Sequence, residues 1–235
     1  MIENVADRIA QPVDGLVVDV TSDLICPWCL VAKRRLEKAS SILGKSLDIR
    51  WHPFQLNPEM PVEGLDRRLY RTAKFGSWEQ SQRLDAQVAA AGAEVGIKFR
   101  HDLMKRTPNT LRGHVLLAAA LKDGLQTQNL VAERLFQAYF LNGEDVGDPT
   151  TLLGIAREFG LTAISQLEDL DSPALVSEVR KEERNAASAG IRGVPQISFQ
   201  GIVVANGAQK EELLANSIRQ ILGTTRHCEN GVCDV

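Results

Sequence analysis

The alternation of apolar and polar positions predicts a β-α-β unit at the start of the chain. After about a dozen mostly polar residues, residues 16–20 (Leu-Val-Val-Asp-Val) form a short β-branched run that is typical of a buried strand. Residues 27–43 then show the apolar spacing of a helix, and Gly44 is a suitable helix stop. Residues 47–51 alternate with a period of two and predict a second strand. Two strands joined by a helix imply parallel pairing.

Helical patterns dominate the middle of the chain, where strand signals are almost absent from residue 66 to residue 184. Helices are predicted at residues 77–91, 109–122, 130–141, 150–159 and 173–189, with glycines between them. Strand patterns return at residues 195–199 and 202–204, with Gln200-Gly201 as a tight hairpin turn in which Gly201 can adopt a positive φ. A last helix is predicted at residues 209–222.

This order of elements is the thioredoxin arrangement with an all-helical domain inserted between the β-α-β and β-β-α halves, so the predicted fold class is α/β. We expect four parts along the chain: a flexible N-terminus (1–13), a thioredoxin-like domain (14–65 and 185–224), a helical insertion domain (66–184) and a C-terminal tail with a Cys-x4-Cys pair (225–235). The absence of a repeat with a fixed period argues against a solenoid.

Composition and charge are those of an ordinary globular protein, with 44% apolar residues, 24% charged residues and a net charge of −3. Without clustered Lys and Arg, neither a nucleic acid nor an anionic membrane is an expected partner. The apolar runs are shorter than the ~20 residues that span a bilayer, and the N-terminus shows no secretory signal pattern. We therefore expect a cytoplasmic protein, in a compartment where paired cysteines are seldom structural.

The four cysteines fall into two close pairs, and the first lies in Cys26-Pro27-Trp28-Cys29 at the start of the first predicted helix. Pro27 is favoured at the first helical position, which makes Cys26 the N-cap, where free backbone N–H groups and the helix dipole favour the thiolate. We expect Cys26 to be exposed and to act as the nucleophile, and Cys29, one turn later, to be sheltered and to resolve the mixed disulfide. Pro27 and Trp28 are expected to tune the redox potential.

A zinc site is the alternative interpretation of these thiols, with Cys228, Cys233 and His227 as the second half of the ligand set. Zinc-binding Cys-x-x-Cys motifs usually lie in a knuckle, whereas this one lies between a β-branched strand and an amphipathic helix. The position favours redox chemistry, and neither a metal nor another bound cofactor is predicted.

Gly193-Val194-Pro195 is the second element of the candidate site, because in the thioredoxin arrangement a proline at the start of the third strand faces the cysteine pair. We predict a cis Val194–Pro195 bond, which leaves the backbone N–H and C=O of Val194 free to pair with an extended substrate chain. A trans proline that merely starts an edge strand is the alternative.

With these motifs in place, residues 17–222 resemble the DsbA-family oxidoreductases, in particular their FrnE-like branch. The resemblance rests on Ser22-Asp23-Leu24-Ile25-Cys26-Pro27-Trp28-Cys29, Trp51-His52-Pro53-Phe54-Gln55-Leu56-Asn57-Pro58, Asn109-Thr110-Leu111 with His114, Leu135-Phe136-Gln137-Ala138-Tyr139-Phe140, Gly190-Ile191-Arg192-Gly193-Val194-Pro195 and Asn206-Gly207-Ala208-Gln209. It implies disulfide exchange with protein or small-thiol substrates, Cys26 as nucleophile, Cys29 as resolving thiol and a cis proline at Pro195.

The same branch looks similar to 2-hydroxychromene-2-carboxylate isomerases and kappa-class glutathione transferases, which use a serine in place of Cys26 and bind glutathione. A glutathione-dependent isomerase or transferase is therefore the alternative function, although the presence of both Cys26 and Cys29 favours an oxidoreductase. The expected partners are thiol- or disulfide-containing proteins or glutathione, and the protein is expected to be a monomer or a homodimer.

The second pair, Cys228 and Cys233, flanks Asn230-Gly231, which favours a type I′ turn. Such a turn brings the two Cα atoms to about 4.5 Å, at the near edge of the range found in disulfides. Some FrnE-like proteins look similar in carrying a second pair near the C-terminus, which suggests a dithiol that exchanges electrons with the first pair. A passive, isolated pair is the alternative.

Two aspartates near the first pair, Asp19 and Asp23, are candidates for relaying protons to Cys29. Ordinary solvation at a strand end is the alternative, and it is favoured for Asp19. His114, in the predicted insertion, has no partner at metal-ligand spacing, and His52, directly before a proline, is interpreted as structural.

Overall fold

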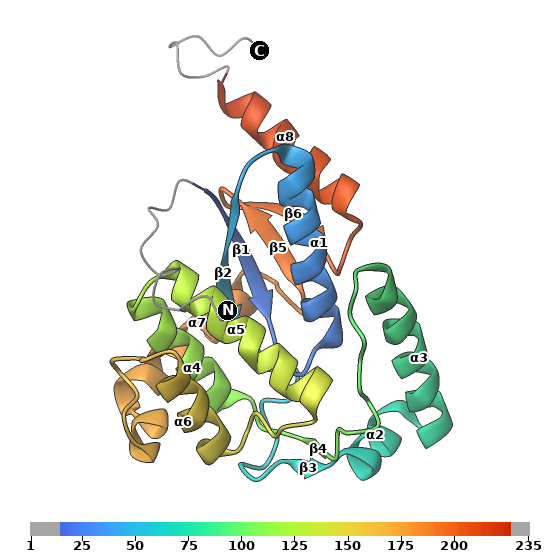
Figure 1. The fold of residues 1–235 in the computed structure, drawn as a ribbon, viewed down its shortest axis with the longest axis vertical. Coiled ribbons are helices and arrows are strands. Elements are labelled where there is room, and N and C mark those ends of the chain that lie inside the picture. The colour runs from blue at the N-terminus through green and yellow to red at the C-terminus, as the bar shows by residue number, and fades with distance from the viewer. Residues whose placement is uncertain (1–14, 227–235) are drawn as a thin grey trace, which may run out of the picture.

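The computed structural model of the protein describes residues 15–226, so the predicted N-terminal segment and the cysteine pair of the tail lie outside the described residues. At its centre is a four-stranded sheet in the order β2-β1-β5-β6 (Figure 1). The strands are β1 (Leu16–Ser22), β2 (Leu47–Pro53), β5 (Gln196–Phe199) and β6 (Ile202–Asn206). β1 pairs in parallel with β2 and antiparallel with β5, which in turn pairs antiparallel with β6. The two predicted halves therefore meet in one sheet.

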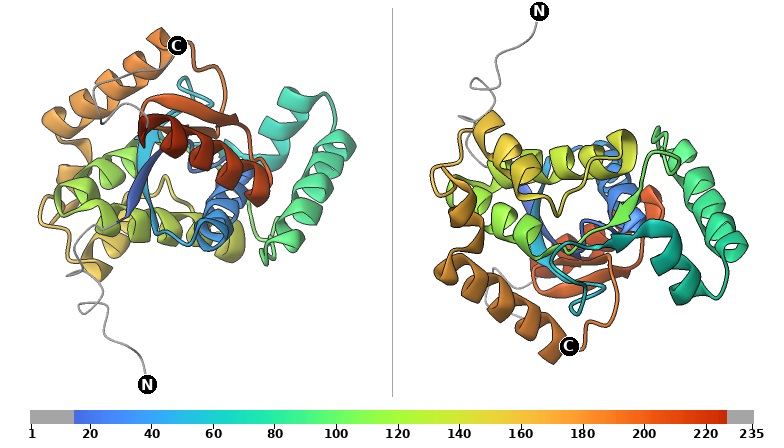
Figure 2. Two further views of the ribbon diagram at one scale, coloured as in Figure 1. Left: turned by 90° about the horizontal axis from the view of Figure 1, so that it is seen from above. Right: turned by 90° about the horizontal axis from the view of Figure 1, so that it is seen from below.

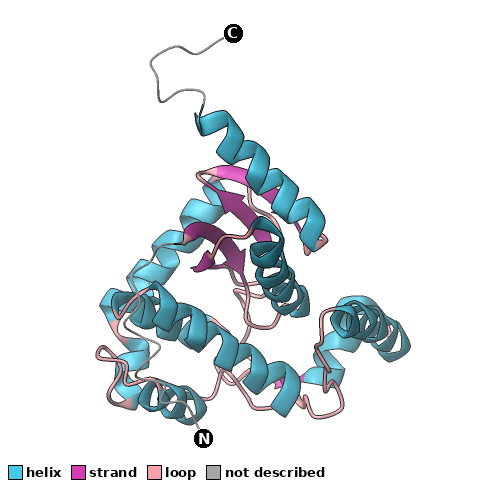
Figure 3. Ribbon diagram, turned by 45° about the horizontal axis from the view of Figure 1, so that its top comes forward, coloured by secondary structure: helices cyan, strands magenta, loops and turns pink. Residues whose placement is uncertain are grey.

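Helices surround this sheet. Two of them, α1 (Pro27–Leu43) and α8 (Glu211–Arg226), pack against each other (Figure 1). The insertion contributes α2 (Arg67–Phe75), α3 (Trp78–Glu94), α4 (Leu111–Lys122), α5 (Leu125–Gln137), the π-helix η2 (Ala138–Asn142), α6 (Pro149–Glu158), the 3-10 helix η3 (Leu167–Asp171) and α7 (Pro173–Ser188). Figure 2 shows α2 and α3 on one flank and α4 to α7 on the other, and in Figure 3 the insertion gathers at the end opposite α8. The predicted α/β class with a helical insertion is confirmed.

No helix within residues 15–226 combines the length and the apolar character needed to cross a lipid bilayer.

The structure differs from the prediction mainly at the start of the insertion. The sequence pattern does not predict α2, because its positions are largely polar; Asp66 starts this helix by accepting a hydrogen bond from the N–H of Leu69 at 2.9 Å. The strands β3 (Leu65–Asp66) and β4 (Arg106–Thr107) pair with each other and are too short to produce a pattern. Helix α5 begins at Leu125 rather than at residue 130, because Gly124 forms its N-cap.

The insertion and the sheet share one hydrophobic core. Trp51 of β2 meets Phe136 of α5 edge-on, with the ring centroids 5.5 Å apart. The buried side chain of Gln128 on α5 donates a hydrogen bond to the carbonyl of Trp51 and accepts one from its N–H, each at 3.0 Å. Because both backbone groups of Trp51 are satisfied in this way, α5 is attached directly to the outer side of β2.

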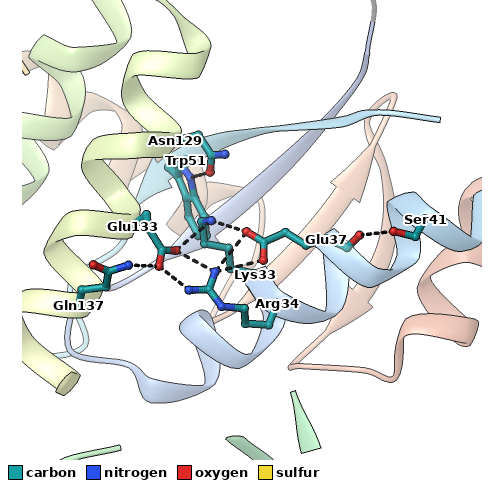
Figure 4. A network of polar contacts seen from close by, with 8 residues as sticks. All are labelled: Lys33, Arg34, Glu37, Ser41, Trp51, Asn129, Glu133 and Gln137. Atoms are coloured by element: carbon teal, nitrogen blue, oxygen red, sulfur yellow. Dashed lines mark hydrogen bonds and ion pairs between the residues drawn. The ribbon is translucent and has the colours of Figure 1, made fainter. Parts of the chain in front are cut away.

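Charged side chains fix α1 against α5 (Figure 4). Glu133 of α5 accepts hydrogen bonds from Arg34 at 2.9 Å and Gln137 at 2.7 Å, and its carboxylate lies 3.0 Å from the Nζ of Lys33, whose side chain is 5% exposed. Burial raises the pKa of Glu133, but the hydrogen bond and charge of Arg34, with the charge of Lys33, outweigh burial and lower this pKa to about 2. The network therefore holds in place the helix that begins at the cysteine pair.

Candidate active site

Cys26 lies where β1 passes into α1. It is the N-cap residue of α1, and Pro27 occupies the first helical turn. The N–H of Cys26 donates to the carbonyl of Asp23 at 3.1 Å, and the carbonyl of Cys26 accepts the N–H of Cys29 at 3.0 Å. The sulfur of Cys26 is therefore carried at a helix N-terminus, where free N–H groups and the helix dipole favour an anion.

Both thiols of this pair are free and buried. Cys29 is 0% exposed, as predicted, but Cys26 is only 5% exposed, so the prediction of an exposed Cys26 is wrong. The reason is Val194, whose backbone lies against Cys26 and accepts its thiol at 3.5 Å. Burial, followed by the hydrogen bond with Cys26 and its charge, raises the pKa of the Cys29 thiol well above the usual range. Cys29 therefore holds its proton more firmly than an ordinary cysteine does.

The Val194–Pro195 peptide bond is cis and lies next to Cys26. The carbonyl of Val194 receives the Cys26 thiol, so the prediction that this C=O is free is wrong. The carbonyl of Pro195 is held by the N–H of Gly207 at 2.7 Å, which fixes the loop to the end of β6. Within residues 15–226 the N–H of Val194 has no hydrogen-bond partner, so it is the group that this loop offers to an incoming chain.

Cys26, Pro27 and Trp28 line one side of a cleft of about 350 Å³. Trp28 is 36% exposed at this cleft. The other walls come from α2, α3 and the π-helix η2, which contributes Tyr139. Isolated π-helical turns are rare in proteins, and those that do occur often lie at functional sites. A largely apolar cleft with a few polar groups beside a nucleophile is the usual form of a small-molecule or peptide site.

Helix α2 brings three cationic side chains, Arg67, Arg71 and Lys74, to this cleft. Arg67 and Arg71 both bind the carboxylate of Asp85 on α3, at 2.7 and 2.8 Å. The Nζ of Lys74 lies 2.8 Å from the hydroxyl oxygen of Tyr70. Since Asp85 is the single acidic residue among those that line the cleft, three cations face one carboxylate, and the cleft attracts anionic groups.

Sequence reasoning misses these cations because the helix that carries them is short and most of its positions are polar. A weaker signal is present: Arg67 and Arg71 are four residues apart, as are Tyr70 and Lys74, and an N-capping aspartate precedes them. This spacing predicts a short polar helix. Only the tertiary structure brings that helix to the cysteine pair.

The structure separates the two aspartates that the sequence offers as proton relays. Asp19 lies on the sheet and binds His52 at 2.8 Å and Arg50 at 3.4 Å, so it is engaged in ion pairs rather than simply solvated. Asp23 is fully buried, and its backbone and charge both act on Cys29. Of the two, Asp23 is therefore the neighbour of that thiol.

The remaining predicted residues, Cys228 and Cys233, lie outside the described residues. Within the part of the chain that the structure describes, there is no group of three or more His, Cys, Asp or Glu side chains arranged to hold a metal ion. The described site therefore consists of the pair Cys26 and Cys29, the Val194–Pro195 loop and the cationic cleft.

Sequence comparisons agree with this arrangement. The profile of the DSBA-like thioredoxin domain matches residues 17–219. The chain is also similar to the uncharacterized protein YwbO of Bacillus subtilis (strain 168), with 27% identity over 198 residues that make up 83% of this chain and 92% of the relative.

Solved structures show the same fold. The probable DsbA oxidoreductase SCO1869 from Streptomyces coelicolor superposes with a TM-score of 0.77 at 26% identity, covering 94% of this chain and 93% of that one. A 2-hydroxychromene-2-carboxylate isomerase has a TM-score of 0.64 at 15% identity, covering 93% and 100% of the two chains. The family profile spans the sheet, the insertion and the site from Cys26 to Pro195, and the chain therefore belongs to the DSBA-like thioredoxin domain family.

Proposed function

We propose that this protein is a thiol–disulfide oxidoreductase of the FrnE-like branch, with Cys26 as nucleophile and Cys29 as resolving thiol. The observation that carries the proposal is the unequal placement of the two free thiols on one helical turn: Cys26 lines the cleft, and Cys29 is fully buried behind it. The free N–H of Val194 beside Cys26 supports extended chains such as proteins as substrates.

In the reductive direction, the Cys26 thiolate attacks one sulfur of a substrate disulfide. A bond between Cys26 and that sulfur forms, the substrate disulfide breaks, and one substrate thiolate leaves. Cys29 then loses its proton and attacks the Sγ of Cys26, which forms the Cys26–Cys29 disulfide and releases the second substrate thiolate. Two electrons have passed to the substrate, and oxidation of a substrate dithiol follows the same steps in reverse.

Reduction of insulin disulfides in the presence of dithiothreitol tests this function. The wild-type protein is expected to accelerate insulin precipitation, and Cys26→Ser is expected to be inactive because the attacking sulfur is gone. An inactive wild-type protein contradicts the proposal.

The cationic cleft favours a second candidate, a glutathione-dependent isomerase or transferase, because glutathione is an anionic thiol and Arg71 and Lys74 line the cleft that Cys26 borders. In that reaction Cys26 positions bound glutathione and Cys29 is dispensable. The Cys29→Ser variant separates the two functions: an oxidoreductase loses turnover and accumulates mixed disulfides on Cys26, whereas an isomerase keeps its rate.

For the second cysteine pair we propose electron exchange with Cys26 and Cys29. The Cys228→Ser/Cys233→Ser double variant is expected to change the redox potential or the turnover of the full-length protein. If both quantities match those of the wild type, the second pair is passive.

A further inference from the structure

A second cavity, of about 210 Å³, lies between the end of β2 and the helices α4, α5 and α7. Among the described residues, none lines both this cavity and the cationic cleft. Figure 1 shows α4 and α7 on the flank opposite α2 and α3. Since a cavity of about 150 Å³ holds a benzene molecule, the second cavity has room for one small organic molecule outside the cationic cleft.

The walls of the second cavity are mostly apolar. Leu117 of α4 and Val179 of α7 are 4% and 1% exposed, and Trp51 of β2 is 3% exposed. Ala118 and Leu121 of α4 add further apolar surface. In such a cavity the apolar walls bind the body of a ligand, and the few polar groups determine its chemistry.

His114 of α4 is the polar group at the buried end of the cavity, with a side chain that is 1% exposed. Its Nε2 is buried without a hydrogen-bond partner and lies 3.6 Å from Oδ1 of Asp23. Within residues 15–226 its Nδ1 has no partner either, and unlike Nε2 it is not a buried atom, so Nδ1 is the nitrogen open to the cavity. Because the carboxylate lies on the Nε2 side, the ring proton is favoured there, and Nδ1 is an acceptor.

Two carboxylates lie at the outer end of the cavity. Glu178 and Glu182 are four residues apart on α7, and their side chains are 47% and 41% exposed. Glu178 lies 3.2 Å from Lys122, and Glu182 lies 3.3 Å from His52, but an ionised carboxylate has about four acceptor positions and each can bind a further donor. No lysine or arginine is among the described residues that line this cavity, whereas three line the cationic cleft. The outer end therefore attracts a cation.

We propose that the second cavity binds a small hydroxylated amine, in which an apolar body separates a hydroxyl group from an ammonium group. The hydroxyl donates to Nδ1 of His114 at the buried end, and the body packs between α4 and α7. The ammonium donates to Glu178 and Glu182 at the outer end. The site does not depend on the proposed thiol chemistry, because no cysteine is among the described residues that line it.

Tyramine, a phenol with an ammonium group on a short side chain, is the probe that tests the site. Proton–nitrogen correlation NMR of the full-length reduced protein follows the titration and locates the ligand. We expect one saturable site, with shift changes at Leu117, Ala118 and Val179 rather than at Cys26 and Trp28. Absence of saturable binding at millimolar tyramine overturns the proposal, as does binding beside the cysteine pair.

Analogues of tyramine test the two polar ends of the cavity. Loss of the ammonium in p-ethylphenol is expected to weaken binding at least about tenfold, because charge-assisted hydrogen bonds are lost. Loss of the hydroxyl in phenethylamine is expected to weaken binding by about two- to tenfold. The carboxylate of p-hydroxyphenylpropionate is expected to prevent binding. If this anion binds as tightly as tyramine, the assigned charge preference is wrong.

Variants of the outer end test the carboxylates. Glu178→Gln/Glu182→Gln keeps the side-chain size and is expected to weaken tyramine binding at least about tenfold, while p-ethylphenol stays within about twofold of its wild-type affinity. Glu212→Gln, on α8, is the control and is expected to bind tyramine as the wild type does. An equal loss for both ligands, or a loss for neither, contradicts the proposal.

Variants of α4 test the inner part of the cavity. Ala118→Phe fills the space and is expected to abolish tyramine binding. Since this variant can also disturb the packing, His114→Phe, which keeps a planar ring, supplies a second test. In it tyramine and phenethylamine are expected to bind equally within about twofold, because the acceptor for the hydroxyl is gone. If the preference for tyramine persists, the role of His114 is refuted.

Discussion

The two flanks of the cysteine pair differ in openness, charge and origin. On the Cys26 side lies a cleft of about 350 Å³ in which Arg67, Arg71 and Lys74 face a single carboxylate. On the Cys29 side lies a closed region with a buried carboxylate and a buried imidazole. The first is built by α2 and α3 and the second by α4, so the helical insertion, rather than the sheet, gives each sulfur its own surroundings. The same helical turn can therefore carry an attacking and a resolving thiol.

The largest effect on activity is expected when the sulfur of either cysteine is replaced with oxygen. We expect Cys26→Ser and Cys29→Ser each to lower the steady-state rate of disulfide reduction by more than about a hundredfold, because neither hydroxyl replaces a thiolate. Only Cys29→Ser is expected to accumulate a stable mixed disulfide, on Cys26, which mass spectrometry of non-reduced protein detects. Accumulation in both variants contradicts the assigned roles.

The network between α1 and α5, which supports both flanks, is tested by Glu133→Gln, which leaves the buried Lys33 with only the half-exposed carboxylate of Glu37. Because the charge-assisted hydrogen bonds to Glu133 are lost while the pairs with Glu37 remain, the free energy of unfolding is expected to fall by about 2 kcal/mol at neutral pH, as measured by urea denaturation. Arg100→Gln, which removes a surface pair with Asp102, serves as the control and is expected to leave the free energy of unfolding unchanged within the error of the measurement.

The pH dependence of this effect follows from the pKa of about 2 for Glu133 in the folded protein. Because the folded pKa lies below the unfolded one, the stabilisation is fully present above the unfolded value of about 4.3 and is lost as pH falls toward 2. The difference between wild type and Glu133→Gln is therefore expected to shrink between pH 5 and pH 2. A constant difference over this range contradicts the assignment.

The sequence allows the sheet, α1 and the chemistry of the cysteine pair to be predicted because these depend on local signals. Period-two strands, a proline at a helix start and two cysteines one turn apart are all readable without a fold. The cations of α2 and the approach of His114 to Asp23 are set by tertiary structure between segments far apart in the chain. The burial of Cys26 could not be predicted for the same reason, since it depends on a loop some 170 residues away.

The role of the positive charge in the open flank is tested by Arg71→Gln and Lys74→Gln. Each is expected to raise KM for an anionic disulfide such as oxidised glutathione by about three- to tenfold, with little change for the neutral hydroxyethyl disulfide. Arg157→Gln, an exposed position on α6, is the control and is expected to leave both substrates unaffected. An equal loss on the anionic and neutral substrates shows that the cations do not recognise charge.

The smallest expected effect concerns His52, at the rim of the closed flank. Burial lowers its pKa, but the hydrogen bonds and charges of Asp19 and Glu182 outweigh burial and raise it. This stabilisation is fully present below the unfolded pKa of about 6.5 and is lost as pH rises through the higher folded value.

We expect His52→Gln to lower the free energy of unfolding by less than about 1 kcal/mol at pH 5.5 and by still less at pH 8.5. Urea denaturation at the two pH values measures this. A larger loss at pH 8.5 than at pH 5.5 reverses the sign and rules out a stabilising imidazolium.

The hydrogen bonds of Gln128 to Trp51 have a consequence for aggregation as well as for the fold. β2 is an edge strand, and an edge with free N–H and C=O groups is a template on which other chains can assemble into aggregates. Gln128 occupies both groups of Trp51 with an amide that cannot continue the sheet. The insertion therefore also prevents strands of other chains from pairing with this edge of the sheet at Trp51. In many other β-sheets, lysines, prolines or bulges at the edge have this effect.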